Sequence, residues 1–422
     1  MRTEKTEVLI IGAGPSGCVA AAYLKKQGVD CQIVEKSVFP RFVIGESLLP
    51  KSMEHFEEVG LFDCIKQQKY QTKHGARFFK KDQFCSFDFS DKHSEGWDWT
   101  WQVPRADFDN VLANEIIKKG VPIHFKCEVT YVAITNDGNS ITTLTDEKGN
   151  LFTVEAKFII DASGNAGVLP SILGLEKPVE MPNQASIFTH ITDTKRPRGE
   201  EGGLITFDVI AEDVWMWIIP FSNGKTSVGV VGPKDFVESF TGSPEERFWK
   251  VMEFSNHFKN RFIGEKFIFE PLSVQNFSKA TTKLYGNGFA LTGNSAGFLD
   301  PVFSSGVALA TESGLLAAKL YTRERNGETV DWETAYTGYL KKGVAVFETY
   351  IKEWYNGNLQ KIIFFEDVNP TIKKQICSVL AGYVWDETNP FVKNHDRLIK
   401  TLAKFTEMEK NSELSLSLLS DS

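Results

Sequence analysis

The sequence predicts an α/β fold: a Rossmann-like, three-layer ββα nucleotide-binding domain, an inserted antiparallel β-sheet domain, and a helical C-terminal part. Three observations support this prediction. A strand, a glycine-rich turn and a helix begin the chain, short segments of alternating hydrophobicity fill its middle, and the pattern becomes helical from about residue 334. A strand–helix–strand order indicates a parallel sheet, whereas short alternating segments indicate antiparallel pairing.

The first elements are predicted to form a βαβ unit. Glu7–Ile11 is an apolar strand, residues 12–17 form a turn, Cys18–Gln27 is a helix with one apolar face, and Cys31–Val34 is a second strand. Gly28 can end the helix, because glycine adopts left-handed backbone angles without strain. This order is typical of the beginning of a dinucleotide-binding domain.

The middle of the chain has a different pattern. Glu128–Thr135, Ser140–Thr145 and Ser186–Asp193 are short alternating segments rich in Thr, Val, Ile and Phe, which indicates antiparallel sheet. The parallel-sheet pattern returns at Phe158–Asp161 and again at Gly288–Thr292. The nucleotide-binding domain is therefore expected to be discontinuous, with a β-rich domain inserted into it.

These patterns predict three regions. We expect a nucleotide-binding domain at 1–75, 100–170 and 280–333, a β-rich substrate domain at 76–99 and 171–279, and a helical region at 334–422. The last residues, 411–422, are rich in Ser and Leu and are expected to be a frayed tail. We find no internal repeat and no Gly/Ser- or Pro-rich linker between the regions.

The composition excludes several classes of function. The net charge of −8 argues against nucleic acid as a partner, and no basic cluster suggests an anionic membrane surface. No signal peptide is apparent, and no apolar run approaches the ~20 residues that a membrane span needs. The six cysteines have neither a C-x-x-C pair nor metal-ligand spacing, which predicts reduced thiols, a cytoplasmic protein and no metal site. The sequence shows no Ser-His-Asp arrangement typical of a hydrolase.

The turn has the sequence Gly12-Ala13-Gly14-Pro15-Ser16-Gly17, with G-x-G-x-x-G spacing between a strand and a helix. The first glycine permits the tight turn, the second lets the backbone approach a pyrophosphate, and the third lets helix and strand pack closely. Glu35, at the end of the second strand, is placed to accept a hydrogen bond from a ribose hydroxyl. The motif predicts a bound dinucleotide, and its proline favours FAD, because flavoproteins often use G-A-G-P.

Two later segments favour FAD over NAD. Ile160-Asp161-Ala162-Ser163-Gly164 ends a strand and resembles a segment of the aromatic-ring flavin monooxygenases, and Leu291-Thr292-Gly293-Asn294-Ser295-Ala296-Gly297 resembles their second flavin motif. Asn294 stands where that family usually has Asp, so it can accept from a ribityl hydroxyl but brings no charge. Arg105 matches the usual flavin-contacting arginine at the start of a helix; the alternative is a surface charge at a helix N-terminus.

Three further segments accompany these motifs. Phe39–Pro50 contains Gly45-Glu46-Ser47, a strand is predicted at Trp215-Met216-Trp217-Ile218-Ile219-Pro220, and residues 300–306 read Asp300-Pro301-Val302-Phe303-Ser304-Ser305-Gly306. Together with Lys73, they resemble the flavin-dependent halogenases, which lie within the superfamily of aromatic-ring monooxygenase-like FAD-binding proteins. The resemblance covers roughly residues 5–330, and the C-terminal part more loosely.

The resemblance implies a role for each segment. Lys73 corresponds to the essential lysine and should point inward, where burial would lower its pKa. Trp215 and Trp217, two residues apart on a strand, should lie on one face and separate the flavin from the substrate. The backbone N–H groups of Ser305 and Gly306 should hold chloride or bromide at a helix N-terminus. The implied FAD contacts are Gly12, Ala13, Gly14, Pro15, Ser16, Gly17, Glu35, Lys36, Arg41, Gly45, Glu46, Ser47, Arg105, Val129, Asp161, Gly293, Asn294, Asp300 and Gly306.

The implied activity is that of an FADH2-dependent halogenase, which uses O2 and a halide to form hypohalous acid and delivers it through Lys73 to an electron-rich aromatic ring. Phe303 stands where members acting on tryptophan tend to carry Glu, which favours the branch acting on phenols or pyrroles, free or bound to an acyl or peptidyl carrier protein. No second loop for NAD(P)H is visible in the sequence, so either a separate flavin reductase supplies FADH2 by transient contact or a nicotinamide cofactor docks transiently.

Three other functions remain open. An aromatic hydroxylase of the same fold would give Lys73 no catalytic role and use the tryptophan pair as ordinary core. A reductase of the geranylgeranyl-reductase type would transfer hydride without halide. A flavin-holding protein without turnover is suggested only by Asn294. The neighbouring lysines are expected to be solvated surface charges: Lys66, Lys69, Lys80 and Lys81.

Overall fold

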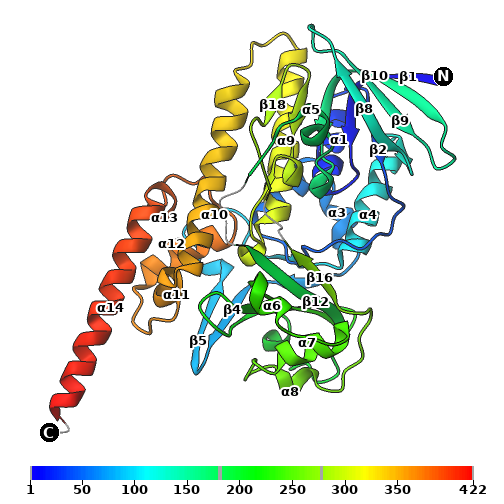
Figure 1. Cartoon of the computed structure of the whole chain (residues 1–422). Helices are drawn as coiled ribbons and strands as arrows, with labels where there is room; N and C mark the ends of the chain where they lie inside the picture. Colours follow the sequence, from blue (N-terminus) through cyan, green and yellow to red (C-terminus); the bar gives the residue numbers. More distant parts are fainter. Residues whose placement is uncertain (1, 179–182, 276–278, 421–422) are drawn as a thin grey trace. The chain divides into compact units, whose positions relative to one another are not determined.

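The computed structural model describes residues 2–178, 183–275 and 279–420, and the chain divides into two compact units (Figure 1). The first unit comprises Met1–Tyr70, Val103–Met181 and Ser278–Lys341. The second comprises Gln71–Gln102, Pro182–Phe277 and Lys342–Ser422.

This division differs from the three predicted regions. The C-terminal helices from Lys342 onward group with the β-rich unit instead of forming a third region. Residues 71–75 and 100–102 also belong to the second unit, whereas 171–178 and 334–341 belong to the first. The parts of the predicted β-rich domain at 179–182 and 276–278 lie outside the described residues.

The first unit is built on a mostly parallel sheet with the order β18-β19-β10-β1-β2-β7. Its parallel strands are β1 (Arg2–Ile11), β2 (Cys31–Glu35), β7 (Ile123–Phe125), β10 (Leu151–Asp161) and β19 (Phe289–Leu291), while β18 (Tyr285–Gly286) is antiparallel. Val8–Ile11 are consecutive and all buried. Such a continuous apolar run is expected where both faces of a parallel sheet are covered.

Helices flank this sheet. α1 (Pro15–Lys26) packs against α9 (Ser305–Arg325) (Figure 1). The other helices of the unit are α2 (Lys51–Glu58), α3 (Phe62–Lys66), α4 (Arg105–Lys118) and α5 (Val168–Leu173). A small sheet is formed by β11 (Glu176–Lys177), β17 (Lys279–Thr281) and β20 (Gly297–Phe298).

Two of the predicted alternating segments belong to this first unit. β8 (Glu128–Ile134) and β9 (Ser140–Thr145) are antiparallel, as predicted, and β9 pairs with the first half of β10. β10 has 11 residues, so its first half can pair with β9 and its last three residues with β19, while β1 lies along its other side.

The second unit contains a seven-stranded sheet with the order β16-β12-β15-β14-β13-β4-β5. The strands are β4 (Gly75–Lys80), β5 (Gln83–Asp88), β12 (Gln184–Thr192), β13 (Ile205–Val209), β14 (Trp215–Pro220), β15 (Lys225–Pro233) and β16 (Leu272–Gln275). All pairs are antiparallel except β13 with β4. β3 (Gln71–Lys73) and β6 (Thr100–Gln102) form a separate two-stranded ribbon.

One face of this sheet forms an apolar core with α6 (Lys234–Glu238), α7 (Pro244–Met252) and α8 (Lys259–Phe262). The predicted helical C-terminal part is confirmed in α10 (Tyr339–Tyr355), α11 (Asn358–Ile363), α12 (Pro370–Leu380), α13 (Pro390–Lys393) and α14 (His395–Ser420). The predicted frayed tail is wrong as far as Ser420, because α14 continues to that residue without a glycine or proline to interrupt it.

The predicted fold class is confirmed: a Rossmann-like parallel sheet, a separate, largely antiparallel sheet and a helical C-terminal part. All six cysteines are free. Among the residues that the structure describes, none of the helices has the length and apolar character needed to cross a membrane.

Candidate functional site

The carboxyl ends of four parallel strands lie side by side in the first unit. Ile11 of β1 is in register with Val34 of β2 and with Asp161 of β10, and Asp161 is in register with Leu291 of β19. Ligands of parallel α/β sheets bind at this edge. The register therefore brings the glycine turn, Glu35 and both predicted flavin segments to one edge, which is the candidate FAD site.

The three glycines of the turn have different neighbours. A Cβ on Gly12, which has a φ of +102°, would lie 2.4 Å from the Ala162 carbonyl oxygen, and a Cβ on Gly17 would lie 2.0 Å from the Gly12 oxygen. A Cβ on Gly14 would meet only the Arg41 Nη2 atom, at 3.8 Å. Packing within the protein therefore explains why Gly12 and Gly17 must be glycine. It does not explain Gly14, whereas the close approach of a pyrophosphate would. The turn fits FAD.

Glu35 is buried and supports the turn. Its Oε2 accepts a hydrogen bond from the Ala13 N–H at 2.9 Å, and its Oε1 accepts from the Ser37 N–H at 2.9 Å. Each carboxylate oxygen has a second lone pair, so a ribose hydroxyl can still donate to it. The predicted place of Glu35 at the end of β2 is confirmed, and its ribose contact stays a prediction.

A buried carboxylate that the sequence analysis missed, Asp109, connects two of the predicted flavin-contacting arginines. It accepts from Arg105 Nε at 2.8 Å and Nη2 at 3.0 Å, and from Arg41 Nη1 at 3.3 Å. Arg105 Nη1 donates to the carbonyls of Ile44 and Gly45, at 3.2 and 3.3 Å. Arg105 is thus buried and anchors the Gly45 segment, which excludes the exposed surface charge considered as its alternative. The available signal was the i,i+4 spacing of Arg105 and Asp109 on one helix.

The later flavin segments are joined to the glycine turn. Ser16 Oγ donates to Thr292 Oγ1 at 2.8 Å, and Thr292 Oγ1 donates to the Asp161 carbonyl oxygen at 3.1 Å. The Gly293 N–H donates to Ser313 Oγ on α9 at 2.8 Å. These bonds connect α1, β10, β19 and α9 around the edge where the strands end.

Asp161 and Asn294 have partners within the protein. The carboxylate of Asp161 accepts from the Ser163 and Leu169 N–H groups, at 2.9 and 2.7 Å, and burial raises its pKa. Asp161 thereby orders the turn that follows β10. The amide nitrogen of Asn294 donates to the Asn165 Oδ1 at 2.9 Å, so its own oxygen is the group that could accept from a ribityl hydroxyl.

The predicted halide segment begins α9. Asp300 accepts from the Val302 N–H at 3.1 Å, and Ser304 follows with a φ of +57°. α9 begins at Ser305 and has 21 residues. The Ser304 side chain forms no capping hydrogen bond at its start. The first N–H groups of a helix have no intrahelical acceptor and lie at the positive end of its dipole. The N–H groups of Ser305 and Gly306 are therefore suitably placed for an anion, and halide binding there stays a prediction.

The remaining predicted flavin contacts lie in different environments. Glu46 and Ser47 are buried, whereas Lys36 is exposed and forms an ion pair with Glu128. Val129 is partly buried on β8 and packs against the core beside the parallel sheet. Their contacts with FAD are not tested by the structure and stay predictions.

Lys73 lies at the end of β3 in the second unit and is only 2% exposed. Its ammonium is 5.4 Å from the centroid of the Phe89 ring. Burial lowers the pKa of Lys73 from 10.5 to about 7, because desolvation disfavours the charged form. The predicted burial is confirmed, and the amine can exist in either protonation state near neutral pH.

The neighbouring lysines behave as predicted with one exception. Lys80 is partly buried and donates to the Gln360 Oε1 on α11 at 2.9 Å, so its prediction as a solvated surface charge is wrong. Residues 80 and 360 are far apart in sequence, and no local pattern indicates this contact. The other three are exposed: Lys66, Lys69 and Lys81.

Trp215 and Trp217 lie on one face of β14, as the strand alternation predicted. Their ring centroids are 6.1 Å apart. Met216 and Ile218 belong to the core on the other face, with α6, α7 and α8. The motif therefore presents two buried indoles on the face opposite that core.

Specific neighbours position the two indoles. Trp217 Nε1 donates to Ser227 Oγ at 3.1 Å, and Trp215 Nε1 donates to the Tyr355 hydroxyl at 3.1 Å. Gly229 is the cross-strand partner of Trp217, and a Cβ there would lie 2.3 Å from the indole. Gly229 therefore provides the space that the Trp217 ring occupies.

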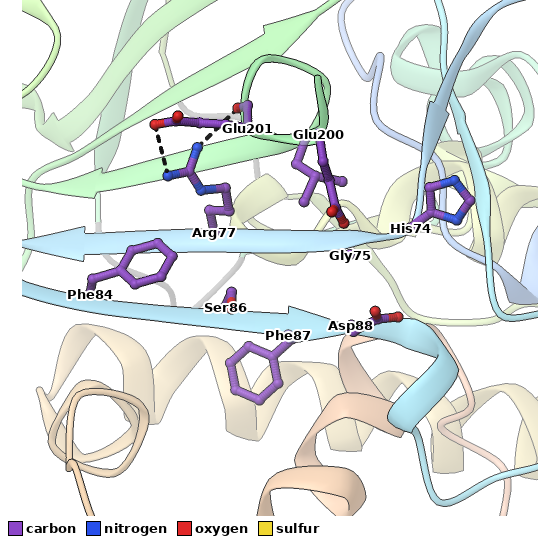
Figure 2. Close-up of a pocket in the computed structure, with 10 residues that line it drawn as sticks. His74, Gly75, Arg77, Phe84, Ser86, Phe87, Asp88, Glu200 and Glu201 are labelled. Atoms are coloured by element: carbon purple, nitrogen blue, oxygen red, sulfur yellow. Dashed lines mark hydrogen bonds and ion pairs between the residues drawn. The ribbon is translucent and has the colours of Figure 1, made fainter. Parts of the chain in front are cut away.

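A pocket of about 470 Å³ begins at the two residues after Lys73. It lies over β4 and β5 and beneath the loop that carries Glu200 and Glu201 (Figure 2). Arg77 reaches this loop, donating to the Glu201 carbonyl at 2.9 Å and pairing with its carboxylate at 3.4 Å. The sequence analysis missed this pocket because three separate segments line it: His74, Gly75, Arg77, Phe84, Ser86, Phe87, Asp88, Glu200, Glu201 and Leu204.

Comparison with known proteins adds four findings. A family model described as FAD binding domain matches residues 5–285. The chain is 28% identical to a 1H-pyrrole-2-carbonyl-(peptidyl-carrier protein) chlorinase of Pseudomonas fluorescens, over 91% of each protein. It is 47% identical to a flavoprotein/dehydrogenase of Cytophaga hutchinsonii, whose structure aligns with a TM-score of 0.94 over 96% of this chain and 100% of that one. The structure of the flavin-dependent brominase Bmp2 shares the fold, with a TM-score of 0.83, 24% identity, and coverage of 96% and 100%.

The geometry of the turn predicts that Gly14→Val abolishes FAD binding and leaves the chain folded. The new side chain meets no backbone atom within 4 Å of its Cβ, but it occupies the path of the pyrophosphate. Flavin absorbance after desalting and the Tm of the flavin-free protein measure the two effects. Gly17→Val is the contrasting variant and should lower the Tm, because its side chain collides with the Gly12 carbonyl. Normal flavin retention by Gly14→Val would overturn the assignment of the phosphate loop.

The burial of Lys73 predicts that Lys73→Met stabilises the protein most at or below pH 7. The folded pKa is about 7 and the unfolded one is 10.5, so between these values the unfolded chain binds more protons and wild-type stability rises with pH. Below pH 7 the desolvation penalty, on the order of a few kcal/mol, is fully present. The Tm of Lys73→Met minus that of the wild type should therefore be largest near pH ~6 and shrink toward pH ~10. A constant difference would contradict a buried amine.

Proposed function

The chain belongs to the FAD-binding domain family, and we propose that within it the chain is a flavin-dependent halogenase, which transfers an electrophilic halogen through Lys73 to an electron-rich aromatic ring. The observation that carries this proposal is the Lys73 amine, which is buried, close to Phe89, and shifted to a pKa of about 7. A solvated surface lysine would have none of these properties.

FAD would be held at the edge where the parallel strands end. Gly14 leaves space for the pyrophosphate, Arg41 lies beside it, and Glu35 faces the same turn. Reduced FAD supplies, with O2, the oxidising power that converts chloride or bromide into hypohalous acid. The N–H groups of Ser305 and Gly306 would bind the halide.

The chemistry we assign to Lys73 follows from its protonation near neutral pH. The neutral amine can attack the halogen of hypohalous acid: an N–halogen bond forms, the O–halogen bond breaks, and hydroxide leaves with an amine proton as water. The ring then takes the halogen and loses a ring proton, which returns the amine. The protonated amine can instead donate a hydrogen bond to the oxygen and direct the halogen to the ring. Burial excludes the water that would compete for the reagent.

The proposed substrate is a phenol- or pyrrole-like aromatic. Phe303 supplies no carboxylate next to the halide segment, so the ring must be reactive enough without a general base there. The pocket that begins at His74 offers the ring of Phe84 and the carboxylates of Asp88 and Glu200, which suit a ring that carries an O–H or N–H donor. The Pseudomonas relative is described as acting on a carrier-bound pyrrole, so a carrier-bound substrate is included in the proposal.

A second candidate function is hydride transfer. The relative from Cytophaga hutchinsonii, at 47% identity, is described as a flavoprotein/dehydrogenase. Such an enzyme would use bound FAD without halide, and the Lys73 amine would have no halogen to transfer. The two functions differ in halide dependence and in the mass of the product.

Product mass distinguishes the candidates. The protein is incubated with FAD, a flavin reductase, NADH, bromide and a panel of phenols and pyrroles. The expected product shows the bromine isotope doublet, whereas a single added oxygen would indicate a hydroxylase and added hydrogens a reductase. Without the flavin reductase we expect little product, because the sequence contains no second nucleotide loop. Rapid reduction of the bound flavin by NADPH alone would contradict the proposed separate reductase.

Substitution of Lys73 tests the second half of the proposed reaction. Lys73→Ala should retain FAD binding and bromide oxidation but lose brominated product by roughly 100-fold or more. Lys73→Arg should not restore activity, because its guanidinium is bulkier and does not deprotonate readily. Lys81→Ala is the matched control, since Lys81 is exposed, and should leave product yield unchanged. Halogenation by Lys73→Ala at the wild-type rate would remove the amine from the mechanism.

A further inference from the structure

The ribbon that carries Lys73 has a polar face. In the β3–β6 pair, Lys73 lies opposite Thr100, and Gln71 lies opposite Gln102. Directly opposed residues of an antiparallel pair point to one face, and so do alternate residues of one strand. These four residues therefore share one face of the ribbon, and Trp101 lies on the other.

Gln102 connects this ribbon to the tryptophan strand. Its side chain is fully buried, and its Nε2 donates to the Pro220 carbonyl oxygen at 2.6 Å and to the Gly203 carbonyl oxygen at 3.2 Å. Because two carbonyl groups accept from this amide, its nitrogen and oxygen cannot exchange places. Pro220 is the last residue of β14, so Gln102 holds the Lys73 ribbon against the strand of Trp215 and Trp217.

Two polar atoms on the Lys73 face lack a hydrogen-bond partner. They are Thr100 Oγ1 and Gln102 Oε1, and within the described part of the chain nothing is bonded to either. Both residues have no exposed surface. An unsatisfied buried polar group destabilises a protein, and two of them on the same ribbon face as a buried amine point to a bound molecule that supplies their partner.

We propose that Thr100 and Gln102 bind hypohalous acid and orient it beside Lys73. This inference rests on the proposed function. Hypohalous acid carries one O–H donor, which the Gln102 carboxamide oxygen or the Thr100 hydroxyl oxygen can accept. When the O–H group of hypohalous acid is bound there, its halogen atom is available to the Lys73 amine on the same ribbon face. The bound hypohalous acid thus donates a hydrogen bond to an acceptor that has no partner within the described part of the chain.

The main test is Thr100→Val, which keeps the shape of the side chain and removes its hydroxyl. If the hydroxyl serves a guest, the Tm should stay the same or rise, because an unsatisfied buried group has been removed. The share of oxidised bromide that reaches a phenol brominated by the wild type should fall roughly threefold to tenfold. The remainder should appear as free hypobromous acid, trapped with monochlorodimedone. Thr100→Ser retains the hydroxyl and should restore the wild-type partition.

Thr142→Val is the matched control. Thr142 lies on β9 in the first unit, is fully buried, and its Oγ1 also lacks a partner among the described residues. Its replacement should change the Tm in the same direction and leave the partition of oxidised bromide unchanged. Gln102→Met provides a second test: it should lower the Tm, because two carbonyls lose their donor, and it should also increase free hypobromous acid.

The two measured quantities separate the possible failures. The total of oxidised bromide, trapped and transferred, reports the proposed function, and the partition between them reports the inference. If the wild type oxidises no bromide, the proposed function fails and this inference fails with it. If the wild type oxidises bromide and Thr100→Val and Gln102→Met partition it as the wild type does, the inference alone is wrong.

Discussion

The register of the parallel sheet is the constraint on which the first unit depends. β10 pairs with β1 along one side and with β19 along the other, and its last residue, Asp161, is level with Ile11 and Leu291. A shift by one residue would move Asp161 and the segment that follows it out of line with Ile11 and Leu291. The same register places the glycine turn next to the later flavin segments, so the packing of the core and the geometry of the FAD site have one cause.

In the first unit, one buried carboxylate forms ion pairs with two arginines. Asp109 is buried and pairs with both Arg41 and Arg105, and an unpaired buried carboxylate would be strongly destabilising. Arg105 also bonds to the backbone at Gly45, which orders the segment that carries Glu46 and Ser47. Arg41 remains partly accessible beside Gly14, and a positive charge there suits the two phosphates of a dinucleotide.

The second unit is destabilised by a buried amine, that of Lys73. Removing Lys73 from water costs free energy that packing elsewhere must offset, and this cost is what shifts its pKa toward neutrality. Thr100 and Gln102 add unsatisfied polar atoms on the same ribbon face. Local destabilisation of this kind is a recurring property of functional sites, because groups prepared for a ligand are not satisfied without it.

The sequence by itself determined the elements and motifs whose signals are local. Strand alternation predicted the shared face of Trp215 and Trp217, and the strand–turn–helix pattern predicted the glycine turn with Glu35 beside it. Burial of Lys73 was also predicted, although from a family resemblance and not from periodicity.

Only the tertiary structure decided which distant residues become partners. Gln102 bonds to Pro220, 118 residues away, and Lys80 bonds to Gln360, 280 residues away. Asp109 joins Arg105 to Arg41, and the pocket after Lys73 is lined from three segments. Hydrophobic periodicity states which face of an element is buried, but it carries no information on what that face meets. Hydrogen bonds between buried groups depend on positions that arise only when the strands and helices pack.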